Sequence, residues 1–361
     1  VNRLLDQQTP VVEHREDTRG QGTSAFPYQH KKIAIPEQIF SVVGEQRKNA
    51  LGIDLASTLE ADALLGTIKQ IPPLTAYPII DGVPVEAELH KAYNPADQQQ
   101  LIGHYSNASE EDILRALESA HKAQPDWNTL GHSARAELLD KVADLMERDS
   151  AQLIGVIAAE GGRTLGDGVS EVREAVDFCR YYALQTRALQ TQAMQTRALP
   201  SQGLQGHGVF LCISPWNFPL AIFVGQIAAA LAAGNTVVAK PAAQTPAIAA
   251  VAIRLFHQAG IPGAALHLLL GSGSQIGKLL ISDSRIAGIA FTGSTVTAQR
   301  INQQLAARPG GPIPFIAETG GQNCMVVDST ALPEQVVDDV ITSAFQSAGQ
   351  RCSALRVLFI Q

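Results

Sequence analysis

Cys352 is the side chain in this sequence with the clearest chemical potential, and it lies in the run Gly349-Gln350-Arg351-Cys352. A cysteine thiolate is a strong nucleophile, and a neighbouring arginine together with local backbone amides favours the thiolate. The alternative is a small structural cysteine beside a surface arginine, because unreactive cysteines are common in protein cores. Cys352 is therefore a candidate nucleophile whose role depends on its surroundings.

Two more side chains have the types that covalent catalysis at a thiolate needs. Asn217 lies in a run with two prolines, Pro215 and Pro219, and a rigidly held amide donor can stabilise an oxyanion. Glu318, at the end of an apolar segment and before two glycines, is a carboxylate that could act as a general base once it is buried. The structural alternatives are a turn asparagine that bonds its own backbone and a helix-capping or salt-bridged glutamate.

Other residues have the types that hold a nucleotide. Lys240 can hydrogen-bond ribose hydroxyls or phosphate, although a solvated lysine is an equal alternative. Glycines let the backbone approach a ligand, and the amides of a following helix favour anions. The glycines of the first such turn are Gly271, Gly273 and Gly277. A second small-residue turn consists of Phe291, Thr292, Gly293 and Ser294.

All of these residues follow short apolar segments, which are the predicted strands. The predicted strands are residues 209–213, 236–239, 266–270, 286–291 and 314–317. Helical patterns alternate with them at residues 224–233, 246–258, 275–281 and 295–306. This alternation predicts an α/β fold with a doubly wound parallel sheet covered on both faces. Such sheets bind ligands at the carboxyl ends of their strands, where the candidate residues lie.

The preceding part of the chain is less regular. Residues 113–149 and 171–182 have helical spacing, and Ser109 is a predicted helix start. Residues 1–85 are weakly periodic, which predicts an arm or interdomain linker with short helices, or a disordered tail. Residues 185–199 repeat a pentapeptide three times, and a period of five suits neither helix nor strand. We interpret residues 184–206 as a low-complexity surface insertion.

Composition narrows the class of protein. A length of 361 residues suggests two domains, and a net charge of -7 gives no reason to expect nucleic acid as a partner. No apolar run is long enough to span a bilayer, and no signal-peptide pattern opens the sequence. The four cysteines form no CxxC pair, which argues against a metal site or a disulfide framework and favours a reducing, cytoplasmic compartment.

The order of the motifs is more specific than any single motif. Ser-Pro-Trp-Asn-Phe-Pro, Val-Ala-Lys-Pro-Ala, Phe-Thr-Gly-Ser-Thr, Glu-Thr-Gly-Gly-Gln-Asn and Gly-Gln-Arg-Cys follow one another, and in this order they resemble the aldehyde dehydrogenase superfamily over about residues 101–361. The resemblance implies a Rossmann-like NAD-binding domain at residues 86–318. It also implies that residues 319–361 are the start of a truncated α/β catalytic domain, and that the repeat lies where relatives carry an oligomerisation segment.

The resemblance also implies a role for each motif residue. Cys352 would attack the aldehyde, Asn217 and the Cys352 amide would hold the oxyanion, NAD would take the hydride, and Glu318 would activate the hydrolytic water. The implied cofactor-binding residues are Ile213, Ser214, Pro215, Trp216, Lys240, Gly271, Gly273, Gly277, Phe291, Thr292, Gly293 and Ser294. The implied substrate-binding residues are Ser353, Arg351 and Phe218.

Finer details resemble one branch of the superfamily. Residues 178–182 and 351–356 are similar to the glutamate semialdehyde (1-pyrroline-5-carboxylate) dehydrogenase module of the bifunctional enzyme of proline catabolism. Residues 1–55 resemble the linker that follows its FAD-dependent proline dehydrogenase module. The resemblance implies oxidation of glutamate γ-semialdehyde to glutamate and an upstream proline dehydrogenase module in a parent chain that is cytoplasmic or peripheral to a membrane. It leaves a homo-oligomer open, because the pentapeptide repeat occupies the region of the oligomerisation segment.

Some residues depart from the superfamily pattern. Ala243 stands where many relatives carry a glutamate that bonds the adenosine ribose, which weakens the case for strict NAD preference over NADP. The sequence opens on Val1 and ends nine residues after Cys352, so we expect a piece of a longer polypeptide with little or no dehydrogenase activity alone. The alternatives are another semialdehyde dehydrogenase, such as one for succinate semialdehyde, and a catalytically silent dinucleotide-binding or structural module. A thiol hydrolase is disfavoured because no histidine follows His267.

Overall fold

The computed structural model describes residues 39–42, 47–195 and 205–361. The opening segment of the predicted arm and the last part of the pentapeptide repeat therefore lie outside the described residues. The helices are α2 (Ile39–Val42), α3 (Thr58–Ile68), α4 (Glu110–Thr129), α5 (His132–Arg148), α6 (Ser150–Gly161), α7 (Leu165–Gln195), α8 (Ala221–Ala232), α9 (Pro246–Gln258), α10 (Gly273–Leu280), α11 (Thr295–Ala306) and α12 (Pro333–Phe345), with 3-10 turns η3 (Gly263–Ala265) and η4 (Gln346–Gly349).

The strands form three sheets, of which the largest has the order β10-β9-β6-β7-β8-β2-β3. Its strands β10, β9, β6, β7 and β8 are parallel, and β2 and β3 are antiparallel additions at one edge. The strands are β1 (Leu74–Ala76), β2 (Ile79–Ile80), β3 (Val83–Pro84), β4 (His90–Asn94), β5 (Asp97–Tyr105), β6 (Val209–Ile213), β7 (Thr236–Lys240), β8 (Leu266–Leu268), β9 (Ile286–Thr292), β10 (Phe315–Glu318), β11 (Asn323–Val327) and β12 (Leu355–Ile360).

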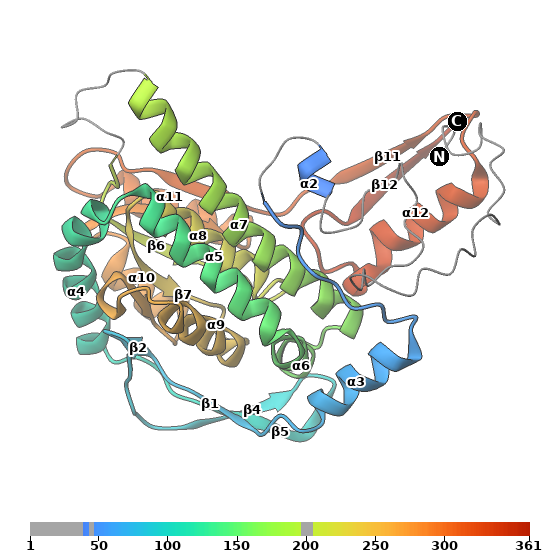
Figure 1. Ribbon diagram of the computed structural model, residues 1–361, viewed down its shortest axis with the longest axis horizontal. Helices are drawn as coiled ribbons and strands as arrows, with labels where there is room; N and C mark the ends of the chain where they lie inside the picture. Colours follow the sequence, from blue (N-terminus) through green and yellow to red (C-terminus); the bar gives the residue numbers. More distant parts are fainter. Residues whose placement is uncertain (1–38, 43–46, 196–204) are drawn as a thin grey trace, which may run out of the picture.

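Helices cover both faces of this large sheet, because the apolar side chains of its strands alternate between two separate cores. In β6, Phe210 and Cys212 belong to the core under α5 to α9, whereas Val209 and Leu211 belong to the core under α4, α10 and α11. Figure 1 shows the two layers of helices on either side of the strands. The predicted doubly wound α/β fold is therefore confirmed.

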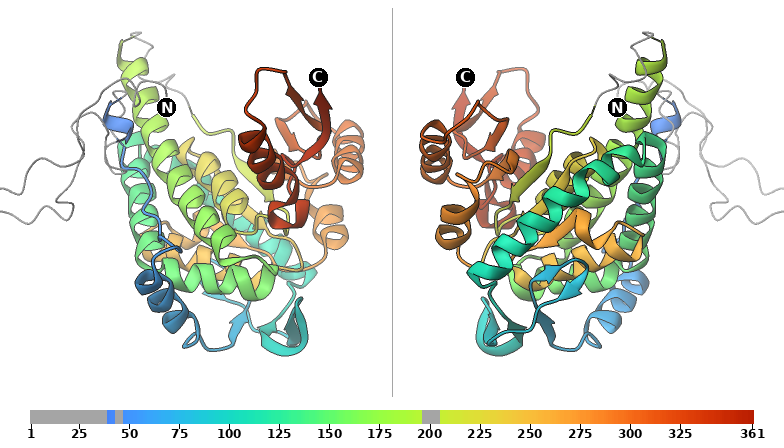
Figure 2. Two further views of the ribbon diagram at one scale, coloured as in Figure 1. Left: turned by 90° about the vertical axis from the view of Figure 1, so that its right-hand side faces the viewer. Right: turned by 90° about the vertical axis from the view of Figure 1, so that its left-hand side faces the viewer.

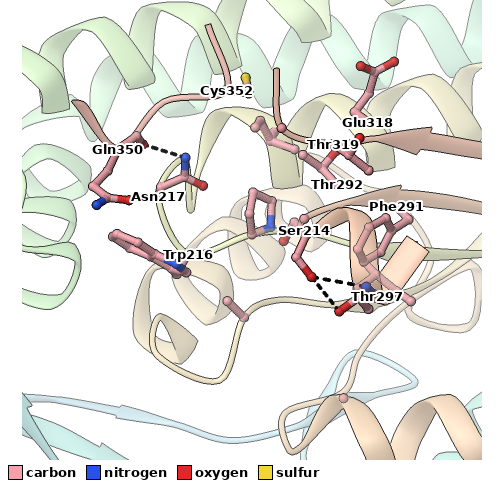
Figure 3. Close-up of a pocket in the computed structure, with 18 of the residues that line it drawn as sticks. Ser214, Trp216, Asn217, Phe291, Thr292, Thr297, Glu318, Thr319, Gln350 and Cys352 are labelled. Atoms are coloured by element: carbon pink, nitrogen blue, oxygen red, sulfur yellow. Dashed lines mark hydrogen bonds between the residues drawn. The ribbon is translucent and has the colours of Figure 1, made fainter. Parts of the chain in front are cut away.

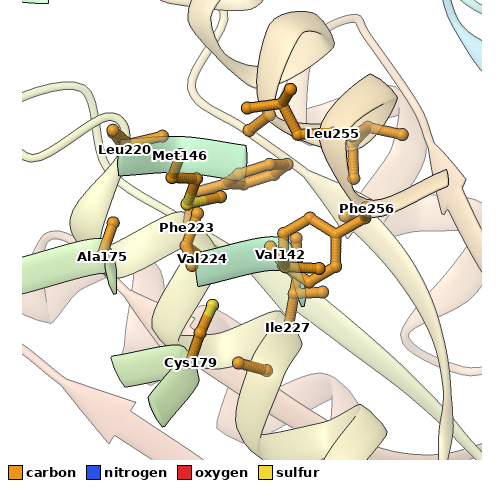
Figure 4. Packing of buried hydrophobic residues seen from close by; sticks show 14 of the residues in the cluster. Val142, Met146, Ala175, Cys179, Leu220, Phe223, Val224, Ile227, Leu255 and Phe256 are labelled. Carbon is orange, nitrogen blue, oxygen red and sulfur yellow. The ribbon is translucent and has the colours of Figure 1, made fainter. Parts of the chain in front are cut away.

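The larger core is built where α5, α7, α8 and α9 meet. Met146, Cys179, Phe223 and Phe256 are fully buried there and pack against one another's helices (Figure 4). Burying an aliphatic or aromatic side chain of this size contributes about 1.5–3 kcal/mol. This packing fixes α8, the helix that follows the loop containing Asn217, against the rest of the domain.

The last part of the chain forms a smaller lobe beside the main body, as both views in Figure 2 show. Strands β11 and β12 pair in parallel, and α12 connects them, so the lobe is a βαβ unit. The segment between α12 and β12 carries Cys352, which places the candidate nucleophile where the lobe meets the main body. The side-chain amide of Asn323, at the start of β11, donates to the carbonyl of Cys352 at 2.7 Å and to that of Ala354 at 3.1 Å.

The helical pattern at residues 113–149 is divided between two helices. Ser109 is the N-cap of α4, and Ser109 and Asp112 form a reciprocal capping box, which confirms the predicted helix start. Gly131 separates α4 from α5 and has φ 89°, a left-handed conformation that is easiest for glycine. None of the described helices is both long and apolar enough to cross a membrane.

Two expectations need correction. Helix α7 continues through residues 185–195, so the first two pentapeptides are helical. Gln, Arg, Ala, Leu and Met are good helix formers whatever their period, and the hydroxyl of Thr186 bonds the carbonyl of Ala232 in α8. The predicted arm also contains strands: β1 pairs with β5, and β2 and β3 join the large sheet.

Two buried carboxylates, on α6 and α7, cap the N-termini of two neighbouring helices, α9 and α8. Glu160, in α6, accepts hydrogen bonds from the amides of Ala247 and Ile248 in α9, at 2.7 and 2.9 Å. Glu171, in α7, accepts from the amide of Ala221 and from that of the preceding residue at the start of α8. An acid at a helix N-terminus satisfies amides that have no partner within the helix and complements the helix dipole.

Burial raises the pKa of Glu160 to about 7, which predicts a pH-dependent stability. Between about pH 4.5 and pH 7 the folded state then binds more protons than the unfolded state, so the free energy of unfolding should fall as pH rises through this window. Glu160→Gln should remove up to about 3 kcal/mol of this dependence. Urea unfolding at about pH 5 and about pH 8 measures it.

The matched control is Glu111→Gln, at an exposed position of α4, which should keep the dependence of the unchanged protein. A slope that is the same in Glu160→Gln and in the unchanged protein would show that the carboxylate is already ionised across the window.

Candidate active site

The register of the large sheet brings the candidate residues into one row. Ile213, the last residue of β6, pairs with Phe291 of β9 and with Lys240 of β7. Thr292, at the end of β9, pairs with Glu318 at the end of β10. The chain leaves β6 toward β7 on one side and returns to β9 on the other. The carboxyl end of these strands is therefore the topological switch point where α/β sheets bind ligands.

A cavity of about 620 Å³ opens at this row (Figure 3), a volume suited to a cofactor or a small ligand. Of the residues singled out in the sequence, its lining includes Ile213, Ser214, Pro215, Trp216, Asn217, Lys240, Gly273, Phe291, Thr292, Gly293, Ser294, Glu318, Arg351 and Cys352. The residues singled out that do not line it are Phe218, Gly271, Gly277 and Ser353. Lining residues that sequence reasoning did not single out include Gln244, Thr297, Thr319, Gln350 and Arg356.

The exposed Cys352 is held close to Asn217 through the backbone of its own loop. The side-chain amide of Asn217 donates to the carbonyl of Gln350 at 2.8 Å, a bond that is visible in Figure 3. An asparagine amide has two N–H groups, so the second one remains for a ligand. Asn323 holds the carbonyl of Cys352 from the other side. The geometry thus unites a thiol and an amide donor that are far apart in the sequence.

Glu318 reaches the same cavity, but the expectation that it would be buried is wrong. Its side chain is exposed, as are Ile316 and Ala317 before it. The reason is that β10 is the outermost strand of the sheet and has one neighbour, β9. The carboxylate is therefore accessible to water from the cavity side.

Arg351 lines the cavity, but its guanidinium turns back toward α12. One of its terminal nitrogens donates to the carbonyls of Thr342 and Ser343 at 2.8 and 3.0 Å, in the last turn of that helix. A cation at a helix C-terminus is favourable because it complements the dipole and the free carbonyls. Ser353 is exposed and lies outside the cavity lining. The substrate-binding roles of Arg351, Ser353 and Phe218 stay predictions.

The cavity has free polar groups that fit a dinucleotide. The hydroxyl of Ser214 is buried and has no hydrogen-bond partner among the described residues. The ammonium of Lys240 bonds the carbonyl of Pro241, at 2.8 Å, and retains two further donors. Ser294, the N-cap of α11, and Thr297 line the same cavity, so the start of that helix lies at the cavity. These groups could hold the hydroxyls and phosphates of a dinucleotide.

Sequence reasoning missed a charged cluster behind the cavity. Arg163, Asp167 and Glu171 have side chains that are 5%, 2% and 0% exposed. Their signal in the sequence is a spacing of four residues, which puts Asp167 and Glu171 on one face of α7, with Arg163 just before that helix. The described residues contain no group of three or more His, Cys, Asp or Glu side chains that could hold a metal ion.

Comparison with known proteins defines the class. Residues 83–361 match the model of the aldehyde dehydrogenase family, and the chain belongs to that family. It is 42% identical to the bifunctional protein PutA of Klebsiella aerogenes, over 100% of this chain and 27% of that protein. It is 33% identical to the 1-pyrroline-5-carboxylate dehydrogenase of Staphylococcus haemolyticus, over 85% of this chain and 62% of that enzyme.

Solved structures agree with this assignment. A proline utilization A (PutA) variant from Bradyrhizobium japonicum superposes with a TM-score of 0.77 and 43% identity, over 92% of this chain and 31% of that one. The chain thus spans about a quarter of the length of the curated PutA proteins it matches, 27% for the Klebsiella protein. The resemblance read from the motifs is confirmed at the level of the family and of its similarity to PutA and 1-pyrroline-5-carboxylate dehydrogenases.

Aldehyde dehydrogenases use NAD or NADP, and Lys240 provides a test of where the dinucleotide binds. Lys240→Met should weaken NAD binding about tenfold or more, because a hydrogen bond from a charged group is worth about 1.5–3 kcal/mol. Burial lowers the pKa of Lys240 to about 8. The affinity of the unchanged protein should therefore fall above about pH 8, where the neutral amine replaces the ammonium.

Fluorescence titration with NAD at about pH 7 and about pH 9 measures both effects. Lys278→Met, at an exposed position of α10 outside the cavity, is the matched control and should bind like the unchanged protein. Equal affinities of the two variants at the lower pH would remove Lys240 from the binding site.

Proposed function

We propose that the protein carrying this chain oxidises L-glutamate γ-semialdehyde to L-glutamate with NAD. The observation that carries the proposal is that Cys352, Asn217 and Glu318, from three separate segments, line one cavity. The choice of substrate is supported by the similarity to PutA and to 1-pyrroline-5-carboxylate dehydrogenase, with 42% and 33% identity.

Cys352 begins the reaction as the nucleophile. Its thiolate sulfur attacks the aldehyde carbon, and the carbonyl electron pair moves onto oxygen to give a thiohemiacetal oxyanion. The second N–H of the Asn217 side chain, together with the Cys352 amide, donates to this oxygen. A fixed donor at a developing charge needs little reorganisation, which is why such groups contribute strongly to catalysis.

The residues along the strand ends hold the cofactor. Ser214 offers its unpaired hydroxyl and Lys240 the two remaining donors of its ammonium, and Gly293 and Ser294 offer the start of α11. When bound, NAD supplies the hydride acceptor that converts the thiohemiacetal to a thioester. Ala243, which lines the cavity, has no carboxylate to repel a 2′-phosphate, so we expect NAD to be preferred over NADP only moderately.

Glu318 completes the cycle. The carboxylate takes a proton from a water molecule, the resulting hydroxide attacks the thioester carbon, and the C–S bond breaks to release glutamate and the Cys352 thiolate. Its exposure to the cavity gives water access to it. Splitting the oxidation into acylation and hydrolysis replaces one difficult step with two easier ones.

The remaining expectations stay predictions. They are an upstream FAD-dependent proline dehydrogenase module, a cytoplasmic location, a homo-oligomer, and little activity of residues 1–361 alone. The expectation of little activity is supported by the smaller lobe. Its helix α12 has no buried residue in the described structure, and Val326, Phe359 and Ile360 are 75%, 55% and 68% exposed. A lobe with so little buried apolar surface contributes little stability of its own.

Substrate preference tests the proposed function directly. The purified protein that carries this chain should reduce NAD with glutamate γ-semialdehyde at a kcat/KM at least about tenfold above that for succinate semialdehyde. Cys352→Ser should lower the rate by about a thousandfold or more, and Cys324→Ser, which changes the other exposed thiol, should not. A higher kcat/KM for succinate semialdehyde would favour a different semialdehyde dehydrogenase. Failure to oxidise either aldehyde would favour a silent module.

Glu318→Gln separates the two half-reactions. The variant should still form about one NADH per active site in a burst, after which turnover should slow by a factor of about 10² to 10⁴, because only hydrolysis needs the base. Rapid mixing with NAD and the aldehyde measures the burst and the later rate. Glu334→Gln, at an exposed position at the start of α12, is the control. Loss of the burst itself would assign Glu318 to the first half-reaction.

A further inference from the structure

Asp167 is a nearly buried carboxylate that the proposed reaction does not use. Its side chain is 2% exposed, and burying an ionised carboxylate is costly unless it is well paired. One oxygen accepts hydrogen bonds from the hydroxyl and amide of Thr164, which is the local pattern at the start of a helix. The other oxygen accepts from Ser347 at 2.9 Å and from Gln346 at 3.2 Å. Half of its bonds are therefore made to the turn that leads into Cys352.

That turn has an unfavourable backbone conformation. Ser347 has φ 56° and ψ 34°, Ala348 has φ 53° and ψ 29°, and Gly349 has φ 67°. Left-handed conformations are disfavoured for residues with a Cβ, and two in succession before a glycine persist only where other contacts hold them. The bond from the Ser347 hydroxyl to Asp167 is such a contact. The turn ends η4 and directs the chain into the loop that carries Cys352.

The same cluster also holds the loop that carries the oxyanion donor. Arg163 donates to the backbone carbonyl of Asn217 at 2.5 Å, and its guanidinium lies 4.6 Å from the centre of the Phe218 ring. Arg163 is 3.4 Å from Glu171 and 4.0 Å from Asp167. The Asn217 amide then bonds the carbonyl of Gln350. The two loops are thus joined directly at one point and through the buried cluster at another.

We propose that Asp167 is a positioning residue: it holds the left-handed turn at residues 347–349, so that Cys352 faces the Asn217 amide, and Arg163 links this turn to the Asn217 loop. The inference rests on the proposed function for its catalytic consequence. A displacement of about 1 Å in a reacting group costs about a hundredfold in rate, so loss of this support lowers kcat without removing any group that touches the substrate or NAD.

The experiment compares Asp167→Asn, Asp167→Ala and Ser347→Ala in the protein that carries this chain. Each should lower kcat about tenfold or more, while KM for the aldehyde and Kd for NAD stay within about twofold. The rate at which iodoacetamide alkylates Cys352 should also change in each variant, and it should change most where kcat falls most. Mass spectrometry of the labelled peptide measures this rate without any aldehyde. Ser347→Gly should retain more activity than Ser347→Ala, because glycine adopts the left-handed conformation without a Cβ penalty.

Glu160→Gln is the control, because it also removes a buried carboxylate that caps a helix, and the hydrogen bonds of Glu160 are made to α9 instead of to either loop. Circular dichroism gives the folded fraction of each variant, and rates are compared per folded molecule. Unchanged kcat and alkylation in folded Asp167→Asn and Ser347→Ala would overturn the proposal, as would losses no larger than in Glu160→Gln. If Asp167→Ala does not fold, the other two variants decide.

The outcome is separable from the proposed function. If the unchanged protein oxidises no aldehyde, the proposed function fails, but a changed alkylation rate of Cys352 in the Asp167 variants still supports the positioning role. If the unchanged protein is active and the Asp167 variants match it in both measurements, only the positioning role fails.

Discussion

The shared register of four parallel strands is the constraint on which the site depends. The backbone hydrogen bonds between β10, β9, β6 and β7 align Glu318 with Thr292, and the adjacent Phe291 with Ile213 and Lys240. Because helices bury both faces of the sheet, its polar side chains meet water and ligands mainly at the ends of the strands. The strand order reverses beside β6, which leaves room for a cavity at the strand ends. The position of the chemistry therefore follows from the topology, before any catalytic residue is considered.

Buried carboxylates connect the helices that cover one face of this sheet. Helix α8 follows the Asn217 loop and has no side-chain cap of its own among the described residues, so Glu171 of α7 supplies the acceptor for its first amides. Glu160 of α6 does the same for α9. Removing one partner from such a pair leaves a buried polar group without a hydrogen bond, which is costly. Helices α6 and α7 therefore set where α8 and α9 begin, and with them the loops at the strand ends.

Local sequence patterns predicted the alternating strands and helices after residue 208 and the residues at the strand ends, because apolar periodicity and turn residues act over a few neighbours. Ile213, Lys240 and Phe291 were found in this way. Burial and partners were harder to predict, since they depend on pairs that are distant in the sequence. The exposure of Glu318 follows from the place of β10 at the edge of the sheet, and the partner of Asp167 is Ser347, 180 residues further on. A pattern within either segment contains neither fact.

The four cysteines show why position decides which thiol can react. Cys179 and Cys212 are fully buried in the core of the main body, and burial raises the pKa of both thiols, that of Cys212 to about 12. Close packing and a low dielectric thus make them inert. Cys352 is exposed because it lies in the short segment between α12 and β12, where the smaller lobe meets the strand ends. A nucleophile needs this accessibility, but an exposed loop is not rigid by itself. The bonds that Asn217, Asn323 and Asp167 make to the backbone or side chains of this loop supply the missing rigidity from both lobes. Cys352 therefore provides the reactivity, whereas Asn217, Asn323 and Asp167 provide the order of its loop. The contacts of these three residues are apparent only from the three-dimensional structure.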